Sequence, residues 1–500
     1  MESKISRRLA EATAPEVCEH VYGPRLARDF PAVFEPLTDV NQAHLLMLLR
    51  AGLMSREDAC TLARALLRIE AEGAAAVSLD AAIEDAYFNY EVHLMSVAGP
   101  RAGGSLHVAR SRNDILATMD RMRARESLLR LLEAGAGACS SALANASVHA
   151  EVVMPGYTHL QPAQPITYGF YLSGVAESIA RDLDRIAAVL PTLRQCPLGA
   201  GALAGTSFPI VQQEAARLLG FEAVVPHALD AVASRDYALA LLSAFAIAAA
   251  GASRVAQDYF VWCTPEFGLI DFPDSVAGTS SIMPQKKNPV VLESLKGKGG
   301  HLMGLLMAAL STVKGVNFTH TGDGNRESMR SFFEAAEECL RVYRLLELVL
   351  RTASPNADVM LERARADFCT ATDLADTLVR ERGLSFREAH HVVGAVVREA
   401  LHDGVAAHQI DSERVDRAAV DHLGRTLRLG DDLVRRSLDP AITAFERRQG
   451  GGPAPEHVRQ RAAELQDSVQ RHVAAARAER QRLAAARQAL KSEIRGLAAA

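Results

Sequence analysis

The chain has 500 residues, of which 49% are apolar and only 5% aromatic, so alanine and leucine supply most of a large potential core. This length allows about two to four domains, or one long helical body with smaller end domains. The formal net charge of −5 excludes a general attraction for nucleic acid or an anionic membrane, so any anionic ligand must be bound by local groups.

Helical patterns dominate the first half of the chain. Two of them lie within 40–72, and the segment 51–55 separates them. Ser55 is the expected N-cap of the second helix, because Asp58 follows it at the capping-box position. Long helical tracts then follow at 112–149, 167–193 and 230–264. Within the last tract, the apolar window 238–250 is too short to span a bilayer and is expected to be a helix buried on all sides.

Two further tracts, 289–313 and 326–351, complete a set that is long enough for a helical bundle. Beyond Pro355 the helices become shorter and more charged, and the linker 449–455 leads to a final helix. Apolar residues recur there at seven-residue intervals, namely Val469, Ala476, Leu483, Leu490 and Leu497. Such a seam more often serves packing than function. We find no convincing alternating strand or hairpin, so the patterns predict an all-α fold.

The seven cysteines are dispersed, and no two lie at the spacing of a zinc site or a redox pair. An odd, dispersed number fits a reducing compartment. The N-terminal sequence MESKISRRLAEA contains no apolar run of the secretory type. We therefore expect a cytoplasmic protein with no metal and no cofactor.

A first group of chemically useful residues is the segment LHVARSRND at 106–114. Its arginines offer forked donors that suit a carboxylate or a phosphate, and Ser111 and Asn113 add neutral donors. The start of a capped, basic helix would have the same composition. On its own, this segment favours neither interpretation.

A second group is the segment MPGYTHLQPAQP at 154–165. It holds His159 between prolines and glutamines, beside the hydroxyl of Thr158. A lone histidine is more often structural, but rigid presentation of a titratable group in a loop favours a functional role.

A third group is the segment GTSSIMPQKKNP at 278–289. Its glycine and prolines indicate a loop, which could be an ordinary solvated turn. Two features oppose that interpretation. Ile282 and Met283 are expected to anchor the loop, and the lysines place positive charge beside hydroxyls that it could help to deprotonate.

Together, these segments resemble the signature regions of the fumarase/aspartase superfamily, and most closely those of argininosuccinate lyase. The resemblance extends from 40 to about 351, includes PLGAGALAG at 197–205 and WCTPEFG at 262–268, and weakens in the last hundred residues. It implies a three-domain all-α fold with an N-terminal helical domain (1–112), a central bundle (113–364) and a C-terminal helical domain (365–500). It also implies a homotetramer in which each active site draws on three chains.

The resemblance further implies an enzyme that cleaves a C–N bond in an N-substituted aspartate and releases fumarate. Ser280 then corresponds to the general base, and Lys286 and Asn288 to groups that hold the carboxylate. His159, paired with Glu293, corresponds to the group that protonates or orients the departing nitrogen. The remaining positions that match substrate-binding residues of the family are Ser111, Arg112, Asn113, Thr158 and Ser281. Arg235 matches an arginine that supports the site.

The half of the site that should hold the arginine portion departs from the family pattern. Val290 stands where the family commonly has an aspartate, and His320, Asn325 and Ser328 stand in place of tyrosine, glutamine and lysine ligands. A guanidinium needs planar anionic partners, which Val290 cannot supply. We therefore expect Val290 and His320 to bind the amine portion of the substrate, and we expect that amine to differ from arginine.

Three functions remain open at this stage. The first is cleavage of argininosuccinate to arginine and fumarate, and the second is cleavage of an aminopolycarboxylate such as ethylenediamine-disuccinate. The third is a crystallin-like or regulatory protein without catalysis. The intact Ser280, His159, Lys286, Asn288 and Glu293 oppose the third.

Overall fold

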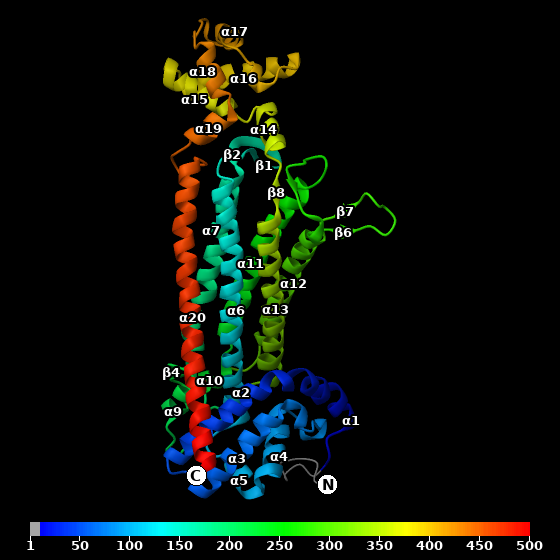
Figure 1. Ribbon diagram of the computed structural model, residues 1–500, viewed down its shortest axis with the longest axis vertical. Coiled ribbons are helices and arrows are strands. Elements are labelled where there is room, and N and C mark those ends of the chain that lie inside the picture. The colour runs from blue at the N-terminus through cyan, green and yellow to red at the C-terminus, as the bar shows by residue number, and fades with distance from the viewer. Residues whose placement is uncertain (1–10) are drawn as a thin grey trace.

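The computed structural model describes residues 11–500, and long helices dominate it (Figure 1). The N-terminal helices form the lower end of the molecule in that view: α1 (Pro15–Val17), α2 (Gly23–Arg50), α3 (Arg56–Glu72), α4 (Ala86–Ala98) and α5 (Pro100–Ser105). Ser55 caps α3 as predicted, because its Oγ accepts the backbone N–H of Asp58 at 3.1 Å.

A central bundle of long helices rises from this end, as the sequence predicts: α6 (Arg112–Val148), α7 (Tyr168–Ala187), α11 (Asp236–Trp262), α12 (Val290–Val313) and α13 (Gly322–Thr352). Short helices flank them: α8 (Leu190–Leu193), α9 (Gln212–Leu218) and α10 (Ala228–Ala233). Fully buried residues such as Leu128, Phe245 and Phe332 form the bundle core. The 37 residues of α6 extend over about 55 Å, so the bundle separates its two ends widely.

The upper end carries a cluster of shorter helices with a core of its own, which includes Leu378, Val392 and Val415. These helices are α14 (Ala357–Ala366), α15 (Ala371–Arg382), α16 (Phe386–Asp403), α17 (Ser412–Leu423), α18 (Asp431–Ser437) and α19 (Pro440–Glu446). The last helix, α20 (Pro455–Ala499), then runs back along the whole bundle to the N-terminal helices (Figure 1).

The seven-residue seam of α20 packs within the chain, which confirms the packing interpretation. Val469 and Ala476 join the bundle core, whereas Leu490 and Leu497 join the core of the N-terminal helices. Leu483 is partly buried between them.

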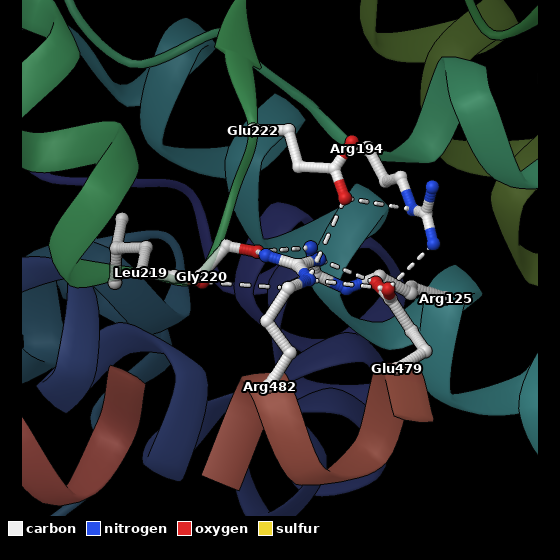
Figure 2. A network of polar contacts seen from close by, with 7 residues as sticks. All are labelled: Arg125, Arg194, Leu219, Gly220, Glu222, Glu479 and Arg482. Carbon is white, nitrogen blue, oxygen red and sulfur yellow. Dashed lines mark hydrogen bonds and ion pairs between the residues drawn. The ribbon is translucent and has the colours of Figure 1, made fainter. Parts of the chain in front are cut away.

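A polar network centred on Glu479 also fastens α20 (Figure 2). Glu479 is only 2% exposed and accepts hydrogen bonds from Arg194 at 2.8 Å and from Arg482 at 2.5 Å. Burial alone would raise the pKa of Glu479, but the guanidinium groups of Arg482 and Arg194 outweigh burial and lower it. Arg482 and Arg125 both donate to the backbone carbonyl of Gly220, at 2.8 and 2.9 Å.

One prediction about strands is wrong, because β1 (Val153–Thr158) and β2 (Gln161–Thr167) form an antiparallel hairpin at the upper end. Its prolines hide the alternating pattern. Its turn residues are His159 and Leu160, with φ of 56° and 57°, instead of the asparagine and glycine that favour this geometry. Two-residue strands form the other pairs: β3 (Gln195–Cys196) with β4 (Ala223–Val224), β5 (Ile270–Asp271) with β8 (Ser354–Pro355), and β6 (Gly278–Thr279) with β7 (Lys287–Asn288).

The apolar helix α11 is less enclosed than predicted. Within residues 11–500 it alone is long and apolar enough to cross a membrane, and 56% of its most apolar window is buried in the bundle. Ile247 on this helix is 48% exposed, so burial on all sides is wrong for a single chain. The neighbouring α12 also exposes large side chains, namely Met303, Met307 and Leu310. Both helices therefore leave apolar side chains uncovered in a single chain.

Candidate active site

The start of α6 is built as a tightly fastened helix cap. The Oγ of Ser111 accepts the N–H of Asn113 at 3.4 Å, and the N–H of Ser111 donates to Asp114 at 2.9 Å. The other oxygen of Asp114 accepts the N–H groups of Gly199 and Gly201, both at 2.9 Å. Burial raises the pKa of Asp114 to about 6, and the three backbone donors limit the rise. The predicted cap is therefore present, and it also holds the loop 197–205 in place.

Arg112 is already partly engaged by the N-terminal helices. Its Nη1 donates to Glu84 at 2.9 Å and to Asp85 at 3.0 Å, and its guanidinium lies 4.1 Å from the ring centroid of Phe88. Sequence reasoning missed both carboxylates. Acidic residues directly before a helix are also typical of N-caps, so this pair did not indicate a partner for Arg112. Asp85 does accept the N–H of Phe88 at the start of α4.

His320 lies beside the same end of the bundle, just before α13. Its Nδ1 is 3.1 Å from the side-chain nitrogen of Asn325. Burial, followed by the positive charges of Arg235, Arg326 and Arg112, lowers the pKa of His320 to about 4. The imidazole is therefore neutral at pH 7. Arg235 is only 4% exposed and pairs with Asp120 at 3.1 Å.

The segment 278–289 forms a narrow hairpin loop that extends away from the bundle (Figure 1). The Oγ of Ser280 accepts the backbone N–H groups of Met283 at 3.0 Å and Ile282 at 3.4 Å. Ile282 is 82% exposed and Met283 is 40% exposed, so their predicted anchoring is wrong for a single chain. Ser281 is also exposed, and Asn288 donates to the carbonyl of Thr279 at 3.3 Å.

The two lysines of this loop differ in their surroundings. Lys287 pairs with Asp271 at 3.3 Å and Asp274 at 3.2 Å. Lys286 makes no salt bridge with any residue of 11–500. Lys286 is therefore the one whose charge is free for a ligand.

Thr158 and His159 are exposed at the tip of the β1–β2 hairpin, at the upper end of the bundle. Within the described part of the chain, no hydrogen bond or salt bridge joins His159 to Glu293, which is exposed in the first turn of α12. The expected pairing of these two residues does not form within one chain.

Val290 begins α12 and packs against Gly278, because a Cβ at position 278 would overlap the Cγ1 of Val290. Val290 and His320 therefore lie at opposite ends of α12, whose 24 residues extend over about 36 Å. Within a single chain, Val290 and His320 are therefore too far apart to contact the amine portion of one substrate molecule.

The candidate residues thus fall into two sets at the two ends of the bundle. The lower set contains Ser111, Arg112, Asn113 and His320. The upper set contains Thr158, His159, the loop 280–290 and Glu293. Among residues 11–500 no group of three or more His, Cys, Asp or Glu side chains could hold a metal ion. A pocket that combines both sets needs more than one copy of the chain.

Comparison with known proteins relates two segments of the chain to lyases. Residues 44–304 match the lyase family model, and residues 368–442 match the model of the argininosuccinate lyase C-terminal region. Argininosuccinate lyase 1 of Shouchella clausii is 39% identical over 462 residues, which cover 92% of this chain and 93% of that protein. Argininosuccinate lyase of Methanothermobacter thermautotrophicus is 37% identical over 438 residues, with coverage of 88% and 93%.

Solved structures give the same relationship. The crystal structure of EDDS lyase in complex with formate has a TM-score of 0.87 and 31% identity, and the match covers 98% of this chain and 96% of that chain. A variant of EDDS lyase with bound fumarate has a TM-score of 0.86 and 30% identity, with the same coverage. Class II fumarase from Schistosoma mansoni shares the fold, with a TM-score of 0.68 and 16% identity over 83% of this chain and 91% of that chain.

Proposed function

The chain belongs to the argininosuccinate lyase family of the fumarase/aspartase superfamily, and from this premise we propose that it cleaves the C–N bond of an N-substituted aspartate. The products are fumarate and an amine. With argininosuccinate as substrate the amine is arginine, which would place the enzyme in arginine biosynthesis. The dispersed cysteines, all of them free thiols, support a cytoplasmic location.

The environment of Ser280 carries the proposal. Elimination requires removal of a proton from a carbon next to a carboxylate, and the resulting carbanion places a second charge on that carboxylate. A serine acts as the base only if its alkoxide is stabilised. The backbone N–H groups of Ile282 and Met283 already point at the Ser280 oxygen, and the unpaired Lys286 lies on the same loop. Lys286 and Asn288 then stabilise the charged carboxylate, as preorganised donors do.

The other residues take complementary roles. Ser111, Arg112, Asn113 and Thr158 bind the carboxylates of the substrate, with Ser281 beside the base. His159, oriented by Glu293, protonates or orients the departing nitrogen. No metal or cofactor is required for these steps.

A homotetramer with shared sites brings the two residue sets together. The uncovered apolar side chains of α11 and α12 support this assembly, because exposed apolar surface of this kind marks interfaces. Analytical ultracentrifugation should find a tetramer. A stable monomer with full activity would contradict it.

The direct test of the base is Ser280→Ala. Loss of a general base should lower kcat by about 10²–10⁴-fold while the substrate still binds. Formation of fumarate, followed by its ultraviolet absorbance, measures the rate. Ser281→Ala is the matched control, because the Ser281 hydroxyl receives no backbone N–H bond within residues 11–500, and it should retain more activity. The reverse order would assign the base to Ser281.

An aminopolycarboxylate is the second candidate substrate. The similarity to EDDS lyase over 98% of this chain supports it. Rates of fumarate release from argininosuccinate and from ethylenediamine-disuccinate would distinguish the two. Absence of turnover with every N-substituted aspartate would instead indicate a non-catalytic protein.

A further inference from the structure

The β1–β2 hairpin that presents Thr158 and His159 is weakly held by its own backbone. Pro155 and Pro165 face each other in its register, and neither residue has an N–H to donate. The register also shifts between Pro155 and Tyr157. An isolated two-stranded hairpin is only marginally stable in water. Contacts from outside the hairpin must therefore hold its tip in place.

Apolar contacts provide part of this support. In the cluster of short helices at the upper end, α14 contacts β1 and α19 contacts β2 (Figure 1). Tyr157 and Ile166 pack beside the bundle core, and the ring of Tyr157 meets that of Phe267 edge-on, with the centroids 6.2 Å apart. Such contacts hold the hairpin against its neighbours, but they are not directional and do not fix its tilt.

Arg447, the residue that follows α19, supplies a directional contact. Its Nη2 donates to both carboxylate oxygens of Asp373, at 2.9 and 2.7 Å, and its Nη1 donates to the backbone carbonyl of Pro165 at 3.1 Å. The side chains of Arg447 and Asp373 are only 22% and 13% exposed, so salt screens this pair less than a surface pair. Burial raises the pKa of Asp373, and Arg447 limits the rise. One guanidinium thus ties β2 to the first turn of α15.

The two ends of this tie are themselves well held. Gly452 lies so close to the backbone carbonyl of Arg447 that a Cβ at position 452 would overlap it. The N–H of Gly452 donates to the carbonyl of Gln449 at 3.2 Å and closes the turn after Arg447. At the other end, α15 contributes Leu378 to the core of the upper cluster. The guanidinium therefore joins the hairpin to a packed helix.

We propose that Arg447 is a positioning residue for His159, and that it acts by fixing the tilt of the β1–β2 hairpin. The inference rests on the proposed function, in which His159 acts on the departing nitrogen. His159 lies four residues beyond Pro155 in β1, about 13 Å along the strand. A tilt of about 5° at the Pro155–Pro165 pair would move the tip by about 1 Å, and a displacement of about 1 Å can lower a rate by about 10²-fold.

The kinetics of Arg447→Ala test the proposal, with fumarate release measured from argininosuccinate or ethylenediamine-disuccinate, whichever is faster. We expect kcat to fall by about 10–100-fold. Arg447→Lys should recover only part of this loss, because one ammonium cannot replace a planar group that bonds Asp373 and Pro165 together. Arg448→Ala is the matched control, since Arg448 pairs with the exposed Glu456 at 3.0 Å, and it should keep its kcat. An unchanged kcat in Arg447→Ala would overturn the proposal.

A double-mutant cycle with His159→Gln separates positioning from a general loss of structure. In the His159→Gln background, Arg447→Ala should lower kcat little further, because the group that it positions is already absent. Thr158 lies on the same hairpin, and its contribution to substrate binding should remain visible as a higher KM. Equal factors in kcat with and without His159 would contradict the proposal. If Arg447→Ala does not fold, Arg447→Lys and Asp373→Asn carry the same cycle.

Hydrogen–deuterium exchange of residues 153–167 measures the hairpin independently of catalysis. Exchange there should be faster in Arg447→Ala than in the unmodified protein, and unchanged in Arg448→Ala. Faster exchange in a protein that releases no fumarate from any N-substituted aspartate would keep the tie but refute the lyase, and with it the catalytic role of Arg447. Fumarate release with an unchanged kcat in Arg447→Ala would keep the lyase and refute the positioning role.

Discussion

Asp114 connects two parts of the candidate site through a single carboxylate. One oxygen holds the N–H of Ser111, and the other holds Gly199 and Gly201. Asn has only one acceptor oxygen, so Asp114→Asn should leave buried N–H donors facing an amide NH₂. We expect a loss of stability of about 1–3 kcal/mol, measured by urea denaturation.

An exposed helix cap provides the control for that change. Asp411 accepts only the N–H of Arg414, and asparagine is an equally good capping residue. Asp411→Asn should therefore change stability little. If both substitutions have the same small effect, the link from Asp114 to the loop 197–205 is not important for stability.

His320 should make the protein sensitive to acid. Its pKa of about 4 in the folded chain lies below the value of 6.5 of an exposed histidine, so the fold favours the neutral ring. Between pH 6.5 and 4 the unfolded chain binds the additional proton, and stability falls as the pH falls. His320→Gln should lower the slope of Tm against pH in this window.

A second histidine of lowered pKa provides a comparison. His107, whose pKa burial also lowers to about 4, should account for part of the slope that remains. An unchanged slope in His320→Gln would mean that its imidazole is not held neutral by the fold.

Sequence reasoning identified chemical groups better than it identified their partners. The unusual density of Ser, Lys and Asn drew attention to the segment 278–289, and the family resemblance assigned the base to Ser280 within it. The two N–H donors on its oxygen became visible only in the loop geometry. The partners of Arg112 could not be predicted. Glu84 and Asp85 are 28 and 27 residues away in the sequence, and only tertiary packing brings them together.

At the scale of elements, the contact between Gly278 and Val290 controls the catalytic loop. Gly278→Ala would push its methyl group into the Cγ1 of Val290 and shift the base of the β6–β7 hairpin. Since displacement of a catalytic group by about 1 Å can lower a rate by about 10²-fold, we expect kcat to fall by about 10–100-fold. Fumarate absorbance measures this change.

Relief of the overlap is the control. Val290→Ala removes the Cγ1 atom, so the double variant Gly278→Ala with Val290→Ala should recover much of the activity relative to Val290→Ala alone. Full activity of Gly278→Ala would contradict a role of this contact in positioning the loop.

Long helices were predictable because their periodic tracts run without interruption. The tracts 112–149 and 289–313 agree closely with α6 and α12. The N-terminal part of α2 was missed, since Pro31 and Pro36 lie inside it and proline usually ends a helix. Ser234, with an extended ψ of 134°, divides the tract 230–264 into α10 and α11.

At the scale of the whole molecule, α20 joins the upper and lower ends of the bundle. The sequence grouped it with the C-terminal domain, and its packing partners lie in the bundle and among the N-terminal helices. Glu479→Gln should remove the buried anion at the centre of the network in Figure 2. Arg194 and Arg482 would then keep only the more exposed Glu222 as an anionic partner, at 3.4 and 3.5 Å. Loss of one member of a buried ion network destabilises by about 3 kcal/mol, which urea denaturation would detect.

The matched control lies on the same helix. Glu464 pairs with Arg461 at 2.9 Å on the surface, where both side chains are about half exposed. Glu464→Gln should leave stability nearly unchanged, because an exposed ion pair contributes little. A similar small effect of both substitutions would show that the network does not fasten α20.

The prediction that the candidate site combines residues from different chains came from the family resemblance and not from the periodicity of the helices. Tract lengths indicate that α6 is long, but they do not show that Ser111 and His159 stand at its two ends until the fold is known. The exposure of Met303 and Met307 could not be predicted, because a helical apolar pattern does not distinguish a core from an interface.

The return of α20 also affects how the protein is made. Leu490, Ile494 and Leu497 complete a core whose other members include Leu62 and Leu66, more than four hundred positions earlier. At roughly 5–20 residues per second, the ribosome adds them about 20–90 s after those leucines. Throughout that interval the nascent chain exposes the apolar side of α2 and α3 that α20 later covers. Chaperones that shield apolar surface should therefore bind this region during translation.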